Sequence, residues 1–295
     1  MSSMTVLVLG SGGREHALAL ACHRDPEVAA VHVAPGNPGT ASFATNHPLD
    51  PCDCDAVVSL ARGLEADLVV VGPEAPLVAG VADALRESGI DCFGPSAEAA
   101  QLEGSKAFAK EVMAAARVPT AASRSCVDAN SVSAALDEFG PPYVVKDDGL
   151  AGGKGVVVTH DRAEALAHAK RCFESDHRVV VEEYLDGPEV SLFAICDGTR
   201  ALPMQPAQDF KRVGNGGVGP NTGGMGAYTP LPWAPDDLVE TVSTTIISPT
   251  LRAMADRGTP FVGLLYVGLA LTSAGPKVVE FLSLIHISEP TRRTP

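Results

Sequence analysis

Two lysines and four glycines lie close together in the segment KDDGLAGGKGVVV, residues 146–158, between two apolar runs. Glycine lets a ligand approach backbone N–H groups, and a lysine ammonium adds positive charge, so this composition suits phosphate binding. The segment is not a Walker A loop, because Asp148 replaces the first glycine and Gly155, after Lys154, has no hydroxyl. The flanking runs instead predict two strands joined by a glycine-rich turn that closes over a triphosphate.

Another glycine-rich turn follows the apolar run near the N-terminus. Gly10, Gly12 and Gly13 lie between a predicted strand and a predicted helix, where free N–H groups can hold a phosphate. Arg14 would add a charge-assisted bond. The Rossmann fingerprint GxGxxG is incomplete, because Glu15 stands in place of its third glycine, and a purely structural turn is the alternative.

Carboxylates at two further strand ends could bind hydroxyl or amine groups. Glu74 follows an apolar run, and ligands of open α/β sheets bind beyond the carboxyl ends of the strands. Glu189 follows the connection in VVVEEYLDGPEVSLFAI, where it could hold ribose hydroxyls while the backbone of residues 183–185 reads adenine. A solvated charged turn is the alternative at both positions.

The composition excludes several classes of protein. The 295 residues are 45% hydrophobic and 20% charged, which is ordinary for a soluble globular chain of two or three domains. A net charge of −14 without a basic stripe argues against nucleic-acid binding. No apolar run approaches the roughly 20 residues of a membrane span. Seven scattered cysteines without a CxxC pair, and no signal peptide, predict reduced thiols and a cytoplasmic protein.

Hydrophobic periodicity predicts two domains. Residues 1–103 alternate strands and helices, which indicates an α/β domain with a parallel sheet and helices on both faces. Residues 104–281 are richer in hairpins and predict α+β subdomains. Strands are predicted at 6–9, 30–36, 66–72, 91–93, 143–147, 155–159, 178–184, 190–196, 263–272 and 277–282, and helices at 17–22, 78–89, 105–118, 131–140, 162–173 and 236–257, the last interrupted by Pro249.

Seven motifs in one order resemble the phosphoribosylamine–glycine ligases, or glycinamide ribonucleotide synthetases, of the ATP-grasp superfamily. They are GSGGREHAL, APGNPGT, VGPEAPL, FGPSAEAAQLEGSKAF, KDDGLAGGKGVVV, EEYLDGPEVS and GPNTGGMGAY. The resemblance implies an N-terminal domain, an ATP-grasp pair of subdomains and a further C-terminal domain. It implies ligation of glycine to 5-phosphoribosylamine through glycyl phosphate, with ATP converted to ADP and phosphate, by a monomeric parent protein.

The resemblance also implies a role for each candidate residue. Residues expected to bind ATP are Lys106, Lys146, Gly152, Gly153, Lys154, Gly155, Glu182, Glu183, Tyr184, Leu185 and Glu189. Residues expected to bind the substrates are Gly12, Gly13, Arg14, Glu74, Lys211, Pro220, Asn221, Thr222, Gly223, Gly224 and Met225. Lys146, Lys154 and Arg212 are expected to be catalytic, and Glu280 to bind Mg²⁺ or Mn²⁺.

Two departures from the family pattern qualify this expectation. Leu282 stands where members usually have Asn followed by Arg-x-Gly-Asp-Pro-Glu, and Asn215 and Gly217 stand where acidic residues are expected. The ending LSLIHISEPTRRTP resembles a translated transposase sequencing adapter, so we expect residues 282–295 to be non-native and this chain to be inactive. The alternatives are another ATP-grasp carboxylate–amine ligase, a non-catalytic nucleotide-binding relative, or a nicotinamide oxidoreductase, against which Glu15 counts.

Overall fold

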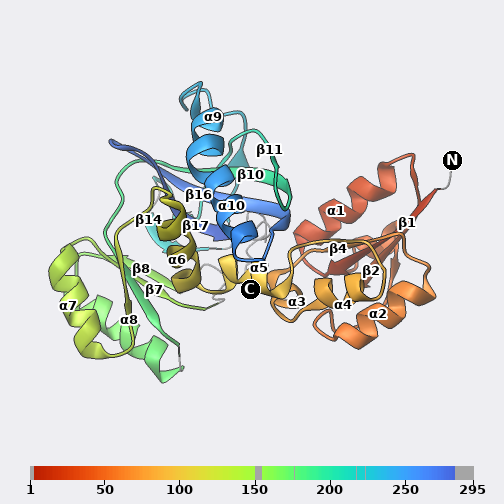
Figure 1. Ribbon diagram of the computed structural model, residues 1–295, viewed down its shortest axis with the longest axis horizontal. Coiled ribbons are helices and arrows are strands. Elements are labelled where there is room, and N and C mark those ends of the chain that lie inside the picture. The colour runs from red at the N-terminus through yellow and green to blue at the C-terminus, as the bar shows by residue number, and fades with distance from the viewer. Residues whose placement is uncertain (1–2, 150–154, 176, 217, 223, 283–295) are drawn as a thin grey trace.

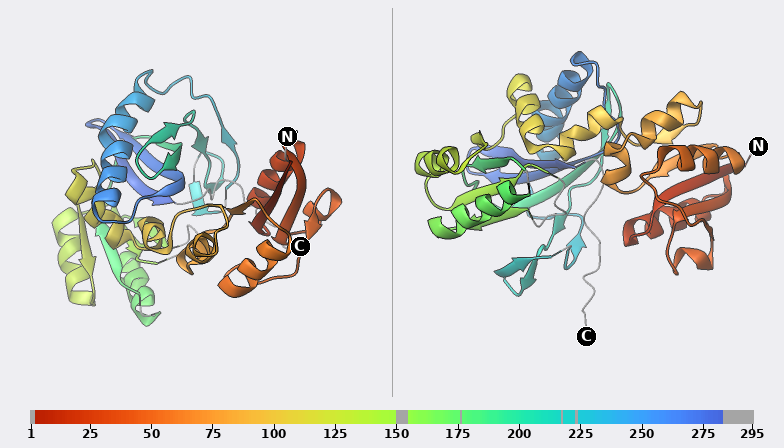
Figure 2. Two further views of the ribbon diagram at one scale, coloured as in Figure 1. Left: turned by 45° about the vertical axis from the view of Figure 1, so that its right-hand side comes forward. Right: turned by 90° about the horizontal axis from the view of Figure 1, so that it is seen from below.

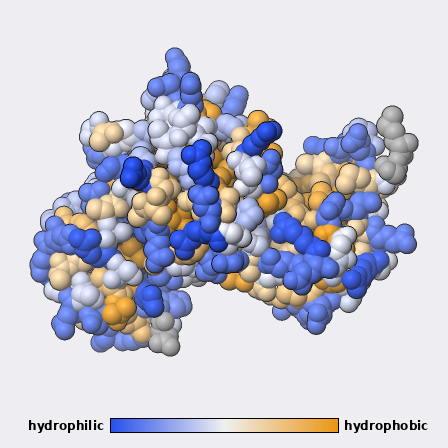
Figure 3. Space-filling view, in the orientation of Figure 1, coloured by the Kyte–Doolittle hydropathy of each residue, from blue (hydrophilic) through white to orange (hydrophobic). Residues whose placement is uncertain are grey.

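The computed structural model describes residues 3–149, 155–175, 177–216, 218–222 and 224–282. These residues form a smaller N-terminal part, red to orange in Figure 1, and a larger part that contains the rest of the chain. The face seen in Figure 3 is largely hydrophilic over both parts, with hydrophobic side chains in small scattered groups. None of the described helices is long and apolar enough to span a membrane.

The N-terminal part is a five-stranded parallel sheet with its helices. Its elements are β1 Met4–Gly10, α1 Gly13–Arg24, β2 Val28–Pro35, a 3₁₀ turn Thr40–Ser42, β3 Thr45–Asn46, α2 Cys54–Gly63, β4 Leu68–Val71, α3 Glu74–Val78, α4 Val81–Glu87 and β5 Cys92–Phe93. The strand order is β3-β2-β1-β4-β5, and β1 pairs in parallel with β2 and β4. The predicted parallel sheet is therefore confirmed.

Alternate residues of the central strands fill two separate cores. Leu7 and Leu9 pack on one face with residues of α2, α3 and α4, whereas Val6 and Val8 pack on the other face with residues of α1. Because successive side chains of a strand point to opposite faces, a strand covered on both sides is apolar at every position. The prediction of helices on both faces is confirmed.

One predicted helix of this part was wrong in its extent. Residues 78–89 do not form one helix, because the chain turns at Gly80, which has a φ of 93° that glycine adopts readily. The structure has α3 and α4 on either side of this turn. Helix α2 was not predicted, although Asp53 caps its N-terminus by accepting a hydrogen bond from the Ala56 N–H.

The larger part contains two antiparallel sheets of four strands, each covered by helices on one face. After α5 Ala97–Gly104, the first antiparallel sheet has the order β6 Ser123–Cys126, β9 Val179–Glu182, β7 Tyr143–Asp147 and β8 Val156–Thr159, covered by α7 Ala129–Phe139 and α8 Arg162–Glu174. The second antiparallel sheet has the order β11 Ala201–Pro203, β10 Glu189–Asp197, β16 Val262–Thr272 and β17 Gly275–Leu282, covered by α6 Lys106–Ala116, α9 Leu238–Val242 and α10 Ser248–Asp256. The predicted α+β organisation is confirmed.

Two short strand pairs extend from the second antiparallel sheet. They are β12 Gln208–Asp209 with β15 Ala227–Tyr228, and β13 Arg212–Gly214 with β14 Val218–Asn221. The right-hand view of Figure 2 shows these teal strands projecting away from the body of the larger part. β14 lies within the glycine-rich stretch 214–226, and β13 and β15 border it.

The two antiparallel sheets are joined by a strip of chain, residues 119–122, that is hydrogen-bonded to both. The Val278 N–H of β17 donates to the Pro119 carbonyl at 2.8 Å, and the Glu183 N–H, after β9, donates to the Ala122 carbonyl at 2.9 Å. Residues 183–188 then carry the chain from β9 in one sheet to β10 in the other. The strand predicted for 178–184 therefore ends earlier, at Glu182, because the chain leaves the sheet there.

The regular α-helix is interrupted close to Pro249, as predicted, although the chain remains helical across the interruption. A π-helical turn, Ser243–Ile247, joins α9 to α10, and Pro249 lies in the first turn of α10. Proline lacks an N–H and crowds the carbonyl four residues earlier, so the wider π turn accommodates it. The Thr250 hydroxyl donates to the Ile246 carbonyl at 2.7 Å and satisfies an acceptor there.

Candidate active site

Lys146 and Glu182 project from the face of the first antiparallel sheet that α7 and α8 do not cover. On β7 and β9, Val145 and Val181 point into the core under α7 and α8. Because side chains alternate along a strand, the next residues, Lys146 and Glu182, point the opposite way. Both are buried, with 5% and 3% of their surface exposed, so their charges interact in a medium that screens them less than water does.

The Lys146 ammonium is held at the junction of the two sheets. Its Nζ lies 2.8 Å from Glu182 Oε2 and donates to the Val279 carbonyl of β17 at 2.9 Å. These contacts use two of the three ammonium N–H groups. No third acceptor for this ammonium occurs among the residues that the structure describes, so an anionic ligand can take the remaining N–H.

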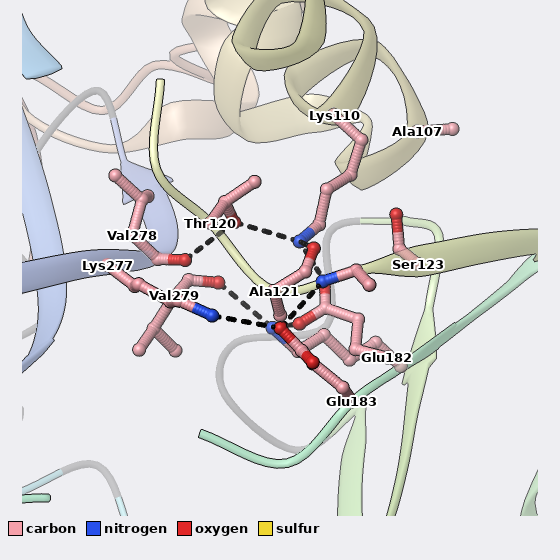
Figure 4. Close-up of polar contacts among 12 residues, drawn as sticks. Ala107, Lys110, Thr120, Ala121, Ser123, Glu182, Glu183, Lys277, Val278 and Val279 are labelled. Atoms are coloured by element: carbon pink, nitrogen blue, oxygen red, sulfur yellow. Dashed lines mark hydrogen bonds and ion pairs between the residues drawn. The ribbon is translucent and has the colours of Figure 1, made fainter. Parts of the chain in front are cut away.

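Lys110, which the sequence did not single out, occupies the other oxygen of the same carboxylate. Its Nζ lies 3.0 Å from Glu182 Oε1 and donates at 2.9 Å to both the Thr120 hydroxyl and the Ala121 carbonyl. Figure 4 shows these contacts converging beside the strip 119–122. Burial lowers the pKa of Lys110, an effect that Glu182 partly offsets and the positive charge of Lys146 strengthens.

Lys106 lies one helical turn before Lys110 on α6 and points to the same region. Its Nζ donates to the Gly149 carbonyl at 3.0 Å, at the start of the glycine-rich turn. Burial lowers the pKa of Lys106, and the nearby Lys146 acts in the same direction while Glu280 opposes it. An anion between Lys106 and Lys146 would relieve this unfavourable concentration of positive charge. The structure thus brings these two predicted phosphate-binding residues together.

Glu183 is fixed at the start of the connection between the sheets. Its Oε1 accepts from the Ala122 N–H at 3.1 Å and lies 3.1 Å from Lys277 Nζ. The hydrogen bond from Ala122 and the charge of Lys277 lower the pKa of Glu183. Because its own N–H is bonded to the Ala122 carbonyl, backbone recognition of adenine would have to use the Glu183 carbonyl and the groups of Tyr184 and Leu185.

A group of carboxylates surrounds Lys211 on the uncovered face of the second antiparallel sheet. Lys211 Nζ lies 3.3 Å from Glu189 Oε2, 3.7 Å from Glu280 Oε1 and 4.0 Å from Asp209 Oδ2. Burial disfavours the charged lysine, but Tyr266 and the carboxylates, Glu280 first, outweigh it and place the pKa of Lys211 well above its ordinary value. Lys211 was predicted to contact substrate, and in this structure its partners are these carboxylates.

Tyr266 and Asp209 adjoin this group. Burial, with the nearby Glu280 and Asp209, raises the pKa of Tyr266 to about 12, and its hydroxyl lies 3.1 Å from the Ser191 hydroxyl. Burial also raises the pKa of Asp209, with Glu189 contributing and Lys211 opposing. Glu189 and Glu280, predicted to bind ribose and metal, are therefore neighbours, although they lie 91 positions apart in the sequence.

The glycine turns of the N-terminal part meet at the carboxyl ends of β1, β2 and β4. The buried Glu15 carboxylate accepts from the Gly12 N–H at 2.7 Å and from Arg14 Nε at 2.5 Å. A Cβ on Gly72 would lie only 2.4 Å from the Glu15 side chain. Glu15, which replaces the third glycine of the GxGxxG fingerprint, therefore fills the space between Gly10 and Gly72 and orders the turn. The side-chain amide of Asn37 connects the turn after β2 to the turn after β1 by donating to the Ser11 carbonyl at 3.0 Å.

The remaining predicted residues are dispersed or not described. Glu74 begins α3, and Gly13 begins α1. Arg212 is exposed and donates to the Gly219 carbonyl at 2.9 Å, and the Thr222 hydroxyl donates to the Lys211 carbonyl at 2.9 Å. Gly152, Gly153, Lys154, Gly217 and Gly223 lie outside the described residues, as do the side chains of Pro220 and Asn221 and the segment 283–295. Tyr184 and Asn215 are exposed, and Leu185 is partly buried. The Gly155 carbonyl accepts from the Asp147 N–H at 2.8 Å, the Gly224 N–H donates to the Thr222 hydroxyl at 3.1 Å, and the Met225 N–H donates to the Phe210 carbonyl at 2.7 Å.

The paired antiparallel sheets, with buried lysines at their junction, define an ATP-grasp protein. Residues 4–103 match the family model described as the N domain of phosphoribosylglycinamide synthetase, and residues 104–284 match the model of its ATP-grasp (A) domain. The chain belongs to the phosphoribosylglycinamide synthetase family. The family expected from the seven motifs is thereby confirmed.

Individual relatives agree with this assignment. The chain is 63% identical over 278 residues to a phosphoribosylamine–glycine ligase of Streptomyces coelicolor, covering 94% of this chain and 66% of the relative. It is 59% identical over 283 residues to that of Mycobacterium leprae, covering 94% and 67%. The chain thus spans about two thirds of the length of these relatives.

Solved structures support the same fold. The crystal structure of a Thermotoga maritima phosphoribosylamine–glycine ligase superimposes with a TM-score of 0.83 at 30% identity, covering 95% of this chain and 69% of that one. A carboxyaminoimidazole ribonucleotide synthase from Aspergillus clavatus, complexed with ATP, gives a TM-score of 0.72 at 19% identity and covers 97% and 71%. At that identity the similarity concerns the fold alone.

Proposed function

We propose that this chain forms part of an enzyme that ligates glycine to 5-phosphoribosylamine with ATP, giving glycinamide ribonucleotide, ADP and phosphate. The observation that carries this proposal is the burial of the Lys146 ammonium at the junction of two sheets, where one of its N–H groups is available to an anion. Lys106 of α6 points to the same region. The names of the relatives supply the reaction. We propose residues 1–103 as the substrate-binding domain and 104–281 as the ATP-grasp domain of a monomeric, cytoplasmic protein.

The lysines would act on the phosphates of ATP. A free carboxylate is a poor acyl donor, so the γ-phosphoryl group is first transferred to the glycine carboxylate, and the amine of phosphoribosylamine then displaces phosphate from glycyl phosphate. Phosphoryl transfer depends mainly on alignment and charge neutralisation. Lys106 and Lys146 would provide both, together with Lys154 of the glycine-rich turn. Residues 183–185 would hold adenine, and Glu189 the ribose hydroxyls.

The donor chemistry beside Lys211 fits a divalent cation. Carboxylate oxygens are the ligands that Mg²⁺ prefers, and Mg²⁺ is commonly held by one or two carboxylates together with substrate phosphates. Among the described residues, no group of three histidines, cysteines or carboxylates is arranged to hold a metal ion without such help. We therefore propose that Glu280 holds Mg²⁺ jointly with ATP. When bound, Mg²⁺ would neutralise charge on the phosphates.

The substrates would lie between the two parts of the protein. The N–H of Gly13 with Arg14 would bind the phosphate of phosphoribosylamine, at the start of a helix where the backbone favours anions. Gly12, whose own N–H is bonded to Glu15, would let the phosphate approach the backbone closely. Glu74 would accept from its hydroxyl or amine groups. Residues 220–225, Lys211 and Arg212 are proposed to contact glycine or its phosphate, and covering this intermediate would protect it from water.

A coupled assay of ADP release tests the proposed reaction. Turnover that requires both glycine and phosphoribosylamine is the expected result for the enzyme. Turnover with a different amine, and not with phosphoribosylamine, would identify another carboxylate–amine ligase. Binding of MgATP with no glycine-dependent ADP release, in this chain and in a version extended to the length of its relatives, would refute the ligase and favour a nucleotide-binding relative.

A further inference from the structure

We propose that Lys110 is a positioning residue of the nucleotide site: by holding Glu182, it leaves the charge of Lys146 available to the phosphates of the nucleotide. This inference rests on the proposed function, because it assumes that Lys146 contacts a nucleotide. It assigns a role to a side chain that the proposed mechanism does not use.

The contacts of Lys110 exclude a direct role in ligand binding. An ammonium group has three N–H donors, and the three close acceptors of Lys110 are Glu182 Oε1, the Thr120 hydroxyl and the Ala121 carbonyl, at 3.0, 2.9 and 2.9 Å. Its side chain is 12% exposed. All donors are thus used inside the protein, and Lys110 must act through the groups that it binds.

Glu182 transmits the effect because its two oxygens have different partners. Oε1 belongs to Lys110 and Oε2 to Lys146, so both lysines together set the plane of the carboxylate. The last torsion of a glutamate side chain has broad minima and does not fix this plane by itself. Without Lys110, the carboxylate is free to rotate and carries Lys146, its partner at 2.8 Å, with it.

The charges point in the same direction. The Lys110, Lys146 and Glu182 cluster has a net charge of +1, from two ammonium groups and one carboxylate. Removing Lys110 lowers the net charge of the cluster to zero, because Glu182 then neutralises Lys146 alone. Because Lys146 and Glu182 are buried and the Lys110 side chain is only 12% exposed, solvent screens this change weakly, and the attraction for phosphate decreases.

A merely structural residue would behave differently. Lys110 also clamps the strip 119–122, whose Thr120 hydroxyl donates to the Val278 carbonyl at 2.7 Å (Figure 4). If that were its whole role, its removal would lower stability or weaken every ligand equally. A positioning role through Lys146 weakens ligands that carry phosphates and spares adenosine, which has none.

The test compares the affinities of MgATP (as its non-hydrolysable β,γ-methylene analogue) and adenosine by calorimetry, with thermal unfolding measured alongside. Lys110→Met is expected to weaken the analogue by roughly tenfold and adenosine by less than about twofold, within the range of a lost charged hydrogen bond. Lys110→Arg, which keeps the charge, is expected to restore most of the ratio and guards against a misfolded methionine variant. Lys170→Met is the matched control, since that lysine is 78% exposed.

A double-mutant cycle with Glu182→Gln tests whether Lys110 acts on Lys146 through Glu182. In that background Lys110→Met is expected to lose its selective effect on the analogue, because the carboxylate that connects the two lysines is gone. An equal loss of both ligands, or an effect undiminished in the Glu182→Gln background, would overturn the role of Lys110 while leaving the nucleotide site intact. Failure of the unchanged chain to bind either ligand would overturn the nucleotide site and the role of Lys110 together.

Discussion

Gly187 is a position where one added methyl group should disturb the connection between the two antiparallel sheets. It lies in the connection between β9 and β10, with a φ of 92°. A Cβ there would lie 2.1 Å from the backbone oxygen of Leu271 and 2.8 Å from its carbonyl carbon. The closest ordinary separation of carbon and carbonyl oxygen is about 3.3 Å, so the connection or β16 must move by about 1 Å.

The expected cost of Gly187→Ala has three parts. A positive φ costs a residue with a Cβ about 1–2 kcal/mol. Overpacking against backbone adds about 1–3 kcal/mol. The movement also strains the hydrogen bond from the Leu271 N–H to the Pro188 carbonyl, 3.0 Å long, worth about 1 kcal/mol. Reduced entropy of the unfolded chain returns up to about 1 kcal/mol. We expect a net destabilisation of about 2–5 kcal/mol.

Gly258→Ala is the matched control. Gly258 lies in the same part of the protein, after α10, with a φ of 82°, but no atom lies within 4 Å of a Cβ built there. Its substitution should therefore cost only about 1 kcal/mol, from the backbone conformation. Urea unfolding followed by the fluorescence of Trp233, the single tryptophan, reports on this part of the chain. Equal destabilisation by the two substitutions would refute the steric argument.

Three further predictions concern charged and thiol groups. Lys146→Met should weaken binding of an ATP analogue by on the order of a hundredfold in calorimetry, because it removes a buried cation and leaves Glu182 underpaired; unchanged affinity would contradict the proposed site. Folding lowers the pKa of Glu183 below the ordinary 4.5, so its carboxylate stabilises the fold above that pH and loses this effect as the pH falls through the folded pKa. Urea midpoints measured at decreasing pH should therefore fall less steeply for Glu183→Gln, and parallel curves would argue against the depressed pKa. Cys52 is exposed, whereas burial raises the pKa of Cys196 to about 12, so mass spectrometry after thiol alkylation should find Cys52 modified and Cys196 intact in the folded chain; the reverse order would contradict the described burial.

The features that follow from local patterns could be predicted. The pairing of Lys146 with Val156 in the β7–β8 hairpin is local, and the apolar runs on both sides of the turn indicated it. Serine directly before a helical run is a favoured N-cap, and the Ser105 hydroxyl accepts from the Phe108 N–H of α6 at 3.1 Å. Both depend on residues close in sequence, whose conformations largely determine the result.

The features that depend on tertiary contacts could not be predicted. Lys110 resembles any charged residue on an amphipathic helix, and its burial results from residues 119–122 folding back across α6. Lys211 was predicted as a substrate contact from the family resemblance. Its partners Glu189 and Glu280 come from two different strands, and no sequence spacing relates them.

The strip 119–122 and the connection 183–188 cross between the two antiparallel sheets side by side, bound to each other through Ala122 and Glu183. Two adjacent crossings form a hinge: the two sheets can rotate about it but cannot slide along each other. We therefore expect the two sheets to open by rotation about this line, a motion that paired spin labels on β8 and β11 would detect as a change in distance. Lys146 and Glu182, which lie at this hinge, would keep their mutual geometry while the outer edges of the site separate.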